Sequence, residues 1–137
     1  MVVTGITFII DGSQQTKDDF TKAKERLLNT IKTLTVDPNK FTVPIVIYNG
    51  DKIIVFTVRK PEDIGEISAQ IKKLPFVPST KPSAEPIKNK VKEVTAGKEM
   101  KVVPIGAITT EVKKIATPIS PDEFVNLYRY SSKYSST

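Results

Sequence analysis

A carboxylate and a hydroxyl follow a short apolar run near the start of the chain. Residues 6–10 read Ile-Thr-Phe-Ile-Ile, and Asp11, Gly12 and Ser13 come directly after them. An apolar run rich in β-branched residues is typical of a central strand buried on both faces. Open α/β sheets carry their ligand sites at the carboxyl ends of such strands. We therefore expect a binding edge at Asp11 and Ser13, whose oxygen atoms suit a hard cation such as Mg²⁺.

Composition excludes several other kinds of chemistry. The 137 residues contain no cysteine and no histidine. Disulfides, thiolate metal sites, thiol nucleophiles and triads with a histidine base are therefore ruled out. The glycines near the first strand also lack the spacing of a nucleotide-binding loop. These features predict a protein that is not an enzyme.

The net charge of +6 results from 21 lysine and arginine residues against 15 acidic residues. Most basic residues are lysines that alternate with acids along the predicted helices, which is typical of a solvated surface. The arginines lie far apart, whereas nucleic-acid sites favour clustered arginine with interleaved aromatic residues, so nucleic acid is an unfavoured partner. A basic polyanion-binding domain remains an alternative. Its candidate residues are Lys81, Lys88, Lys90 and Lys92.

The elements that must position Asp11 and Ser13 can be predicted from periodicity. Apolar residues recur every three or four positions from Asp18 to Leu34, which predicts a helix. Two runs rich in β-branched and aromatic residues, 41–48 and 52–58, flank Asn49-Gly50. This dipeptide favours a two-residue hairpin turn, because both central positions need a positive φ.

The remaining chain continues the alternation. A helix is expected from residue 61 to about residue 74, then a proline-rich loop over 75–86, a helix from 87 to Gly97, a strand over 101–107, and helices over 110–116 and from 121. This order predicts a three-layer α/β/α sandwich with a mostly parallel central sheet and one antiparallel edge strand. Residues 1–130 would form a single domain, and 131–137 a flexible tail rich in serine and tyrosine.

Several of these segments together resemble a von Willebrand factor type A domain. They are the strand that ends in Asp-Gly-Ser, the long amphipathic helix, the late strand within Ala96–Ala107 and the helical stretch Val112–Ala116. The chain is shorter than the usual family member by a strand and its helix, so the third helix is expected to lead straight into the late strand. The resemblance implies a protein-binding module of the adhesion or matrix type.

The resemblance also implies a metal-ion-dependent adhesion site, with Asp-x-Ser-x-Ser after the first strand. Asp11 and Ser13 match this motif, but Gln15 stands at its third position. Thr80 is the natural counterpart of the family's threonine in the second loop, and the aspartate of the third loop has no match. Lys81 adds positive charge that opposes a cation. We expect a degenerate site of Asp11, Ser13 and Thr80 that binds Mg²⁺ weakly or stays vacant.

Another interpretation of Asp11 and Ser13 needs no metal. Side chains of these types cap helices and tighten turns, and Gly12 would ease the turn here. On this view the motif marks the fold. It does not form a working site.

A protein partner is expected at the loops that follow the strands, residues 11–16, 76–83 and 106–110. Within them, Gln15, Ser79, Lys81 and Thr109 are candidate contact residues. The alternative is a structural or assembly subunit that self-associates through a sheet edge, since a missing strand and helix leave an edge less covered.

Location is weakly constrained. The family resemblance slightly favours an extracellular or particle-associated protein, although Met1–Val3 lacks the basic start of a signal peptide. No apolar run approaches the roughly 18 residues of a membrane span.

Overall fold

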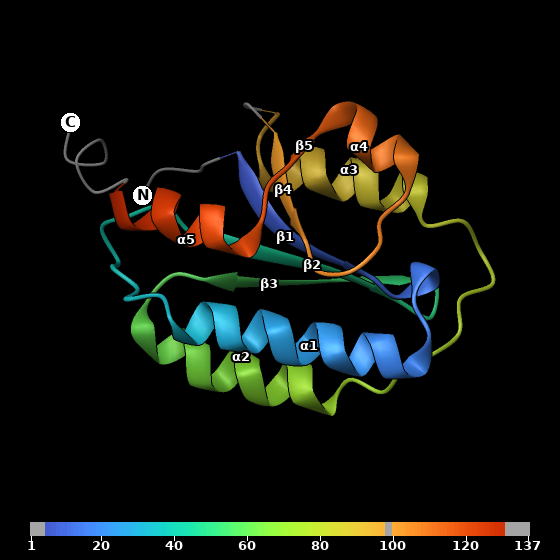
Figure 1. Cartoon of the computed structure of the whole chain (residues 1–137), viewed down its shortest axis with the longest axis horizontal. Helices are drawn as coiled ribbons and strands as arrows, with labels where there is room; N and C mark the ends of the chain where they lie inside the picture. Colours follow the sequence, from blue (N-terminus) through green and yellow to red (C-terminus); the bar gives the residue numbers. More distant parts are fainter. Residues whose placement is uncertain (1–4, 98–99, 131–137) are drawn as a thin grey trace.

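One sheet organises the part of the chain that the computed structural model describes, residues 5–97 and 100–130. Its strand order is β3-β2-β1-β4-β5 (Figure 1). The strands are β1 Ile6–Asp11, β2 Val43–Asn49, β3 Lys52–Val58, β4 Lys101–Pro104 and β5 Thr117–Pro118. The helices are α1 Lys17–Lys32, α2 Pro61–Lys73, α3 Ala84–Val94, α4 Thr110–Ile115 and α5 Pro121–Tyr130, with the 3-10 turn η1 over Gly12–Gln14.

β1 lies at the centre of the sheet and runs parallel to both neighbours. Phe8 pairs with Ile45 on β2 and with Val103 on β4. β2 and β3 pair in antiparallel fashion, so β3 is an antiparallel edge strand. Every residue of β1 and β2 is buried, as expected for strands covered on both faces. The predicted mostly parallel sheet with one antiparallel edge is confirmed.

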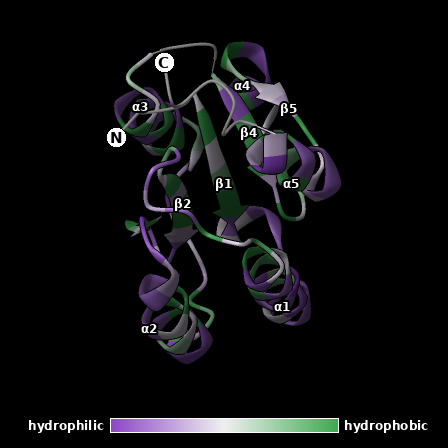
Figure 2. Ribbon diagram, turned by 90° about the vertical axis from the view of Figure 1, so that its left-hand side faces the viewer, coloured by the Kyte–Doolittle hydropathy of each residue, from purple (hydrophilic) through white to green (hydrophobic). Residues whose placement is uncertain are grey.

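Helices cover both faces of the sheet. α1, α2 and α5 lie on one face, and α3 and α4 lie on the other (Figures 1 and 2). Side chains of a strand alternate between the two faces. Phe8 and Ile10 accordingly belong to the core under α1, α2 and α5, whereas Ile9 belongs to the core under α3 and α4. The predicted α/β/α sandwich is therefore present.

Aromatic contacts hold α5 over β1. The rings of Phe124 and Phe8 meet edge to face with centroids 4.8 Å apart. The Tyr128 hydroxyl accepts a hydrogen bond from the Asp37 amide at 3.0 Å, and the Lys40 ammonium donates to the Tyr128 carbonyl at 3.0 Å. The end of α5 is thus fixed to the connection between α1 and β2.

The helices begin at capping signals that the sequence shows. The Thr16 hydroxyl oxygen accepts from the Asp19 amide at 3.1 Å at the start of α1, and Ser120 accepts from Glu123 at 3.1 Å at the start of α5. Pro61 is the first residue of α2, where its missing N–H costs no helical hydrogen bond.

The hairpin turn lies one residue later than the sequence predicted. Gly50 and Asp51 have positive φ values of 57° and 65°, so they form the two-residue turn in place of Asn49-Gly50. Asn49 pairs with Lys52 as the last residue of β2. Its side chain donates to the Pro75 carbonyl at 2.8 Å and accepts from the Val77 amide at 2.9 Å, which favours a strand position for Asn49.

The boundaries after α2 also differ from prediction. α3 begins at Ala84, so the proline-rich loop is shorter than expected and Pro86 lies in the first turn of the helix. Proline is tolerated there because first-turn N–H groups have no helical acceptor. β4 ends at Pro104, short of the predicted residue 107, and β5 was not predicted because two residues carry no periodic signal.

The predicted flexible tail, residues 131–137, lies outside the described residues. Among residues 5–97 and 100–130, none of the helices combines the length and the apolar character that crossing a membrane requires.

Candidate functional site

Asp11 stands at the carboxyl edge of the sheet as the last residue of β1, and its side chain is fully buried. The chain turns directly after it at Gly12. A Cβ atom at position 12 would lie 2.6 Å from the Tyr48 carbonyl oxygen. Since backbone cannot yield at that distance, glycine is required for β1 to end against β2.

Within the described residues, three groups donate hydrogen bonds to the Asp11 carboxylate. The Ser13 amide and hydroxyl donate to Oδ1 at 3.0 and 2.6 Å. The Ser83 hydroxyl donates to Oδ2 at 2.6 Å, and the two serine oxygens are 3.0 Å apart. A buried carboxylate needs such partners because it has lost its water. Asp11, Ser13 and Ser83, the Asp11 cluster, join the end of β1 to the start of α3.

Ser83 was missed by the sequence analysis. It is the residue before α3, yet its hydroxyl makes no cap hydrogen bond to the helix, since it donates to Asp11. A signal for it does exist in the chain. Ser83 precedes Ala-Glu-Pro, and a serine followed by an acid and a proline is typical of a helix start.

Thr80 does not join the Asp11 cluster, which corrects the predicted grouping. Its hydroxyl donates to Asp51 Oδ2 at 2.5 Å, and its amide donates to Asp51 Oδ1 at 2.7 Å. The Lys81 amide donates to the same Oδ1 at 2.9 Å. Asp51 in the β2–β3 turn therefore anchors the loop between α2 and α3. Along this loop Thr80 contacts Asp51, and the chain meets Asp11 three residues later, at Ser83. The second hydroxyl near Asp11 is therefore that of Ser83.

Hydrogen bonds lower the pKa of the Asp51 carboxyl below its ordinary value, above all those from the Thr80 hydroxyl and the Lys81 amide. The neighbouring Tyr48 hydroxyl donates to the Lys81 carbonyl at 3.2 Å. Burial raises the pKa of Tyr48, and the negative charge of Asp51 raises it further. Asp51, Thr80 and Lys81, which we call the Asp51 latch, join the β2–β3 turn to the loop between α2 and α3, and the Tyr48 hydroxyl adds a hydrogen bond to the same loop.

Gln15 occupies the third position of the adhesion motif but turns its amide toward backbone. Its Nε2 donates to the Asp11 carbonyl at 3.2 Å and to the Ile105 carbonyl at 3.4 Å. A Cβ atom at Gly106 would lie 3.0 Å from the Gln15 side chain, so the amide fits against a glycine. Gln15 therefore joins the carboxyl ends of β1 and β4, and the Asp11 cluster lacks the hydroxyl that a serine would add.

The other candidate contact residues have different surroundings. Lys81 is exposed, and the Thr109 hydroxyl accepts from the Val112 amide at 3.4 Å as the cap of α4. The Ser79 hydroxyl is buried, and no partner for it is found among the described residues. Ser79 and Lys81 come from the loop between α2 and α3, which follows a helix and not a strand as predicted, whereas Thr109 comes from the loop after β4.

The electrostatics of the Asp11 cluster rest on a single carboxylate. Across residues 5–97 and 100–130, no three side chains of Asp, Glu, His or Cys gather as a metal-binding group. The cluster offers one negative charge and two hydroxyl oxygens, whose protons already point at Asp11. Mg²⁺ is usually anchored by one or two carboxylates in near-octahedral geometry.

A polar hollow of about 350 Å³ lies beside the Asp11 cluster, between α1 and the loop after β4. Its lining includes both glutamines of the turn after β1 and two exposed cations one helical turn apart, Lys22 and Arg26. Asp19 supplies a negative charge at the same rim. The hollow can therefore accept polar groups of a partner, the acidic ones with more attraction than repulsion.

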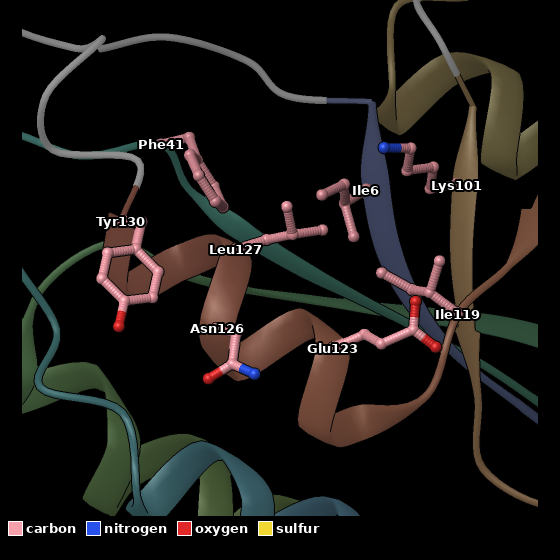
Figure 3. A pocket seen from close by; sticks show the side chains of 8 residues that line it. All are labelled: Ile6, Phe41, Lys101, Ile119, Glu123, Asn126, Leu127 and Tyr130. Atoms are coloured by element: carbon pink, nitrogen blue, oxygen red, sulfur yellow. The ribbon is translucent and has the colours of Figure 1, made fainter.

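A second pocket, of about 640 Å³, lies at the opposite end of the sheet. Its wall is mainly apolar, with Leu127 of α5 directed toward Ile6 of β1 and Ile119 close by (Figure 3). Lys101 and Glu123 are the charged side chains that line it. This pocket is separated from the Asp11 cluster by the length of β1, so it does not belong to that site.

The family model of the von Willebrand factor type A domain matches residues 5–105, which cover β1 to β4 and the Asp11 cluster. The chain therefore belongs to the von Willebrand factor type A family. Domains of this family are generally protein-interaction modules without enzymatic activity. No curated protein matches the chain.

Proposed function

We propose that this chain is a non-enzymatic protein-binding module of the adhesion or matrix type, and that its partner contacts the carboxyl edge of the sheet. The observation that carries the proposal is the Asp11 cluster. Its hydrogen bonds hold the turn after β1 and the start of α3 at one point, while Gln15 holds the end of β4 there. Loops of different origin thus form one rigid face, as a protein-binding surface requires.

The polar hollow beside the cluster supports a partner with an acidic or amide-bearing segment. Lys22 and Arg26 supply positive charge, and the side chains of Gln14 and Gln15 supply donors and acceptors. Two lysines of α3 are less available, since Lys88 pairs with Glu85 at 2.7 Å and Lys90 pairs with Glu93 at 2.8 Å. This arrangement favours a specific protein contact over a diffuse polyanion surface.

The metal site is degenerate in this proposal. Asp11, Ser13 and Ser83 would be the ligands, and a cation bound there would supply positive charge for a partner's carboxylate. The cluster has one carboxylate, and both serine hydroxyls already donate to it. Such a set of ligands does not bind a divalent ion tightly. The cluster therefore acts chiefly by fixing the loops, and binding of the partner does not depend on Mg²⁺.

The binding face can be tested with a phage-displayed peptide library selected on the full chain. Enriched peptides should lose binding to a Lys22→Glu/Arg26→Glu variant and retain it with Leu127→Lys, which changes an exposed position in the pocket at the other end of the sheet. Equal binding to both variants would overturn the proposal, and so would a selection that enriches nothing.

Calorimetric titration with MgCl₂ and MnCl₂ separately tests the metal site. We expect no saturable heat at millimolar concentrations of either ion and no thermal shift. Heat that Asp11→Ala abolishes would show a working cation site. The degenerate interpretation would then be wrong, while the peptide experiment would still decide the binding face.

A further inference from the structure

The edge of the sheet at β3 presents unpaired backbone groups in a pattern that its register defines. The turn at Gly50 and Asp51 makes Asn49 and Lys52 the first facing pair of the hairpin. In a two-residue hairpin this pair is hydrogen bonded, and hydrogen-bonded and non-hydrogen-bonded pairs then alternate. The residues of the non-hydrogen-bonded pairs direct N–H and C=O away from β2. On β3 they are Ile53, Val55 and Thr57.

Nothing in the described part of the chain covers this edge. No hydrogen bond to the outward backbone groups of these three residues occurs within residues 5–97 and 100–130. The Val55 side chain is 38% exposed. The usual protections of an edge strand are missing too, because β3 contains no proline, its register with β2 runs without a bulge, and its charge, Lys52, stands at the first position.

The other edge of the sheet offers much less. β5 comprises Thr117 and Pro118, and its partner β4 ends in Pro104. Two residues, one of which has no N–H, cannot support a ladder. The open edge is therefore β3, on the opposite side of the sheet from the short strand.

We propose that β3 pairs with β3 of a second copy of this chain, antiparallel and about a two-fold axis through Val55. Val55 then faces Val55 of the second copy, and Ile53 faces Thr57 in both directions. All of these residues carry outward N–H and C=O groups, so the three pairs that they form are hydrogen bonded, and Ile54 faces Phe56 in the non-hydrogen-bonded pairs between them. The result is one continuous sheet across both copies, an isologous dimer formed by strand addition.

Charge distribution favours a second copy as the occupant of this edge. α2 lies next to β3 and carries Glu62 and Asp63 in its first turn, with Lys72 and Lys73 in its last turn. A two-fold axis at β3 makes the two α2 helices antiparallel, so Glu62 and Asp63 of one copy, which follow the exposed Arg59 and Lys60, lie toward Lys72 and Lys73 of the other. A like-charged edge helix would instead repel its own copy. The carboxyl-edge face stays free, so the inference is independent of the proposed function.

Cysteine cross-linking tests the register directly, because the chain contains no native cysteine. In a Val55→Cys variant the facing Cα atoms would be about 5.5 Å apart, within disulfide range. Ile53→Cys is the matched control, since its two copies would lie about 13 Å apart along the paired strands. Under mild oxidation we expect the Val55→Cys dimer to form about tenfold faster than the Ile53→Cys dimer or more. Equal rates would overturn the proposed register.

Sedimentation measured over a concentration series tests the association without any cysteine. The unmodified chain should shift from monomer to dimer, and Val55→Lys should lose that shift because each dimer would bury two facing lysines. Leu127→Lys is the matched control, since Leu127 is similarly exposed, at 41%, and lies on α5. A chain that remains monomeric at millimolar concentration overturns the proposal, and so does a dimer that Val55→Lys leaves intact.

Discussion

Asp11 and Asp51 lie at the carboxyl ends of neighbouring strands, and both accept hydrogen bonds from the segment between α2 and α3. Their surroundings differ. Asp11 is fully buried and accepts two serine hydroxyls and one amide. Asp51 is half-buried and accepts two amides, of Thr80 and Lys81, and two hydroxyls, of Thr80 and Tyr48. One carboxylate holds the core together, and the other positions a loop.

The difference follows from access to water. A buried carboxylate that loses a hydrogen-bond partner cannot replace it with water. Removing any member of the Asp11 cluster should therefore lower the free energy of unfolding of the whole domain. Asp51 can exchange its partners for solvent, and the loop can detach while the sheet remains folded. The loop that bears Ser79 and Lys81 is therefore held by Asp51, whose hydrogen bonds are the more easily replaced by water.

The largest expected effect is that of Asp11→Ala. It leaves the hydroxyls of Ser13 and Ser83 without their buried acceptor, and we expect a loss of about 3 kcal/mol in the free energy of unfolding. Urea denaturation measures this loss. Asp18→Ala, on the exposed first turn of α1, is the control and should cost about 0.5 kcal/mol. A loss for Asp11→Ala no larger than that of the control would contradict the structural role of the cluster.

Ser83→Ala should have a smaller effect, about 1 to 2 kcal/mol, because Asp11 keeps both hydrogen bonds from Ser13. A double-mutant cycle between Ser83→Ala and Asp11→Ala should show coupling, since the two side chains share a hydrogen bond. The pair of Ser83 and Thr80 provides the contrast. Thr80 bonds to a different carboxylate, so the stability losses of Ser83→Ala and Thr80→Val should add. Energetic coupling between these two substitutions would contradict the separation of the Asp11 cluster from the Asp51 latch.

The smallest effect on global stability is expected at the Asp51 latch. Its folded pKa lies below the ordinary value of 3.8, so the latch is intact above about pH 4 and is lost as the pH falls through the lower folded pKa. Thr80→Val removes the hydroxyl that lowers the pKa of Asp51 most, so the Asp51 latch should be lost at a higher pH. Carboxyl NMR titration and hydrogen exchange at Lys81 would follow both changes. An unshifted titration in Thr80→Val would contradict the assignment.

Much of the fold could be predicted from local patterns. The β-branched runs of β1 to β3, the amphipathic period of α1 and the capping residues Thr16 and Ser120 each reflect preferences of a few neighbouring residues. The boundaries that failed involve partners distant in sequence. Asn49 is in a strand because Pro75 and Val77 bond to its side chain, which no local signal near Asn49 indicates.

The same distinction applies to the candidate site. The sequence by itself determined that an oxygen-rich edge lies at Asp11 and Ser13, because a buried strand ending in polar residues has few other arrangements. It also predicted a poor set of cation ligands there, since Gln15 replaces a serine of the motif and the aspartate of the third loop has no match. Only the tertiary structure decided which hydroxyl completes the cluster. Thr80 and Ser83 are three residues apart in one loop, and the choice between them depends on Asp51, a residue of another strand connection whose position no local pattern encodes.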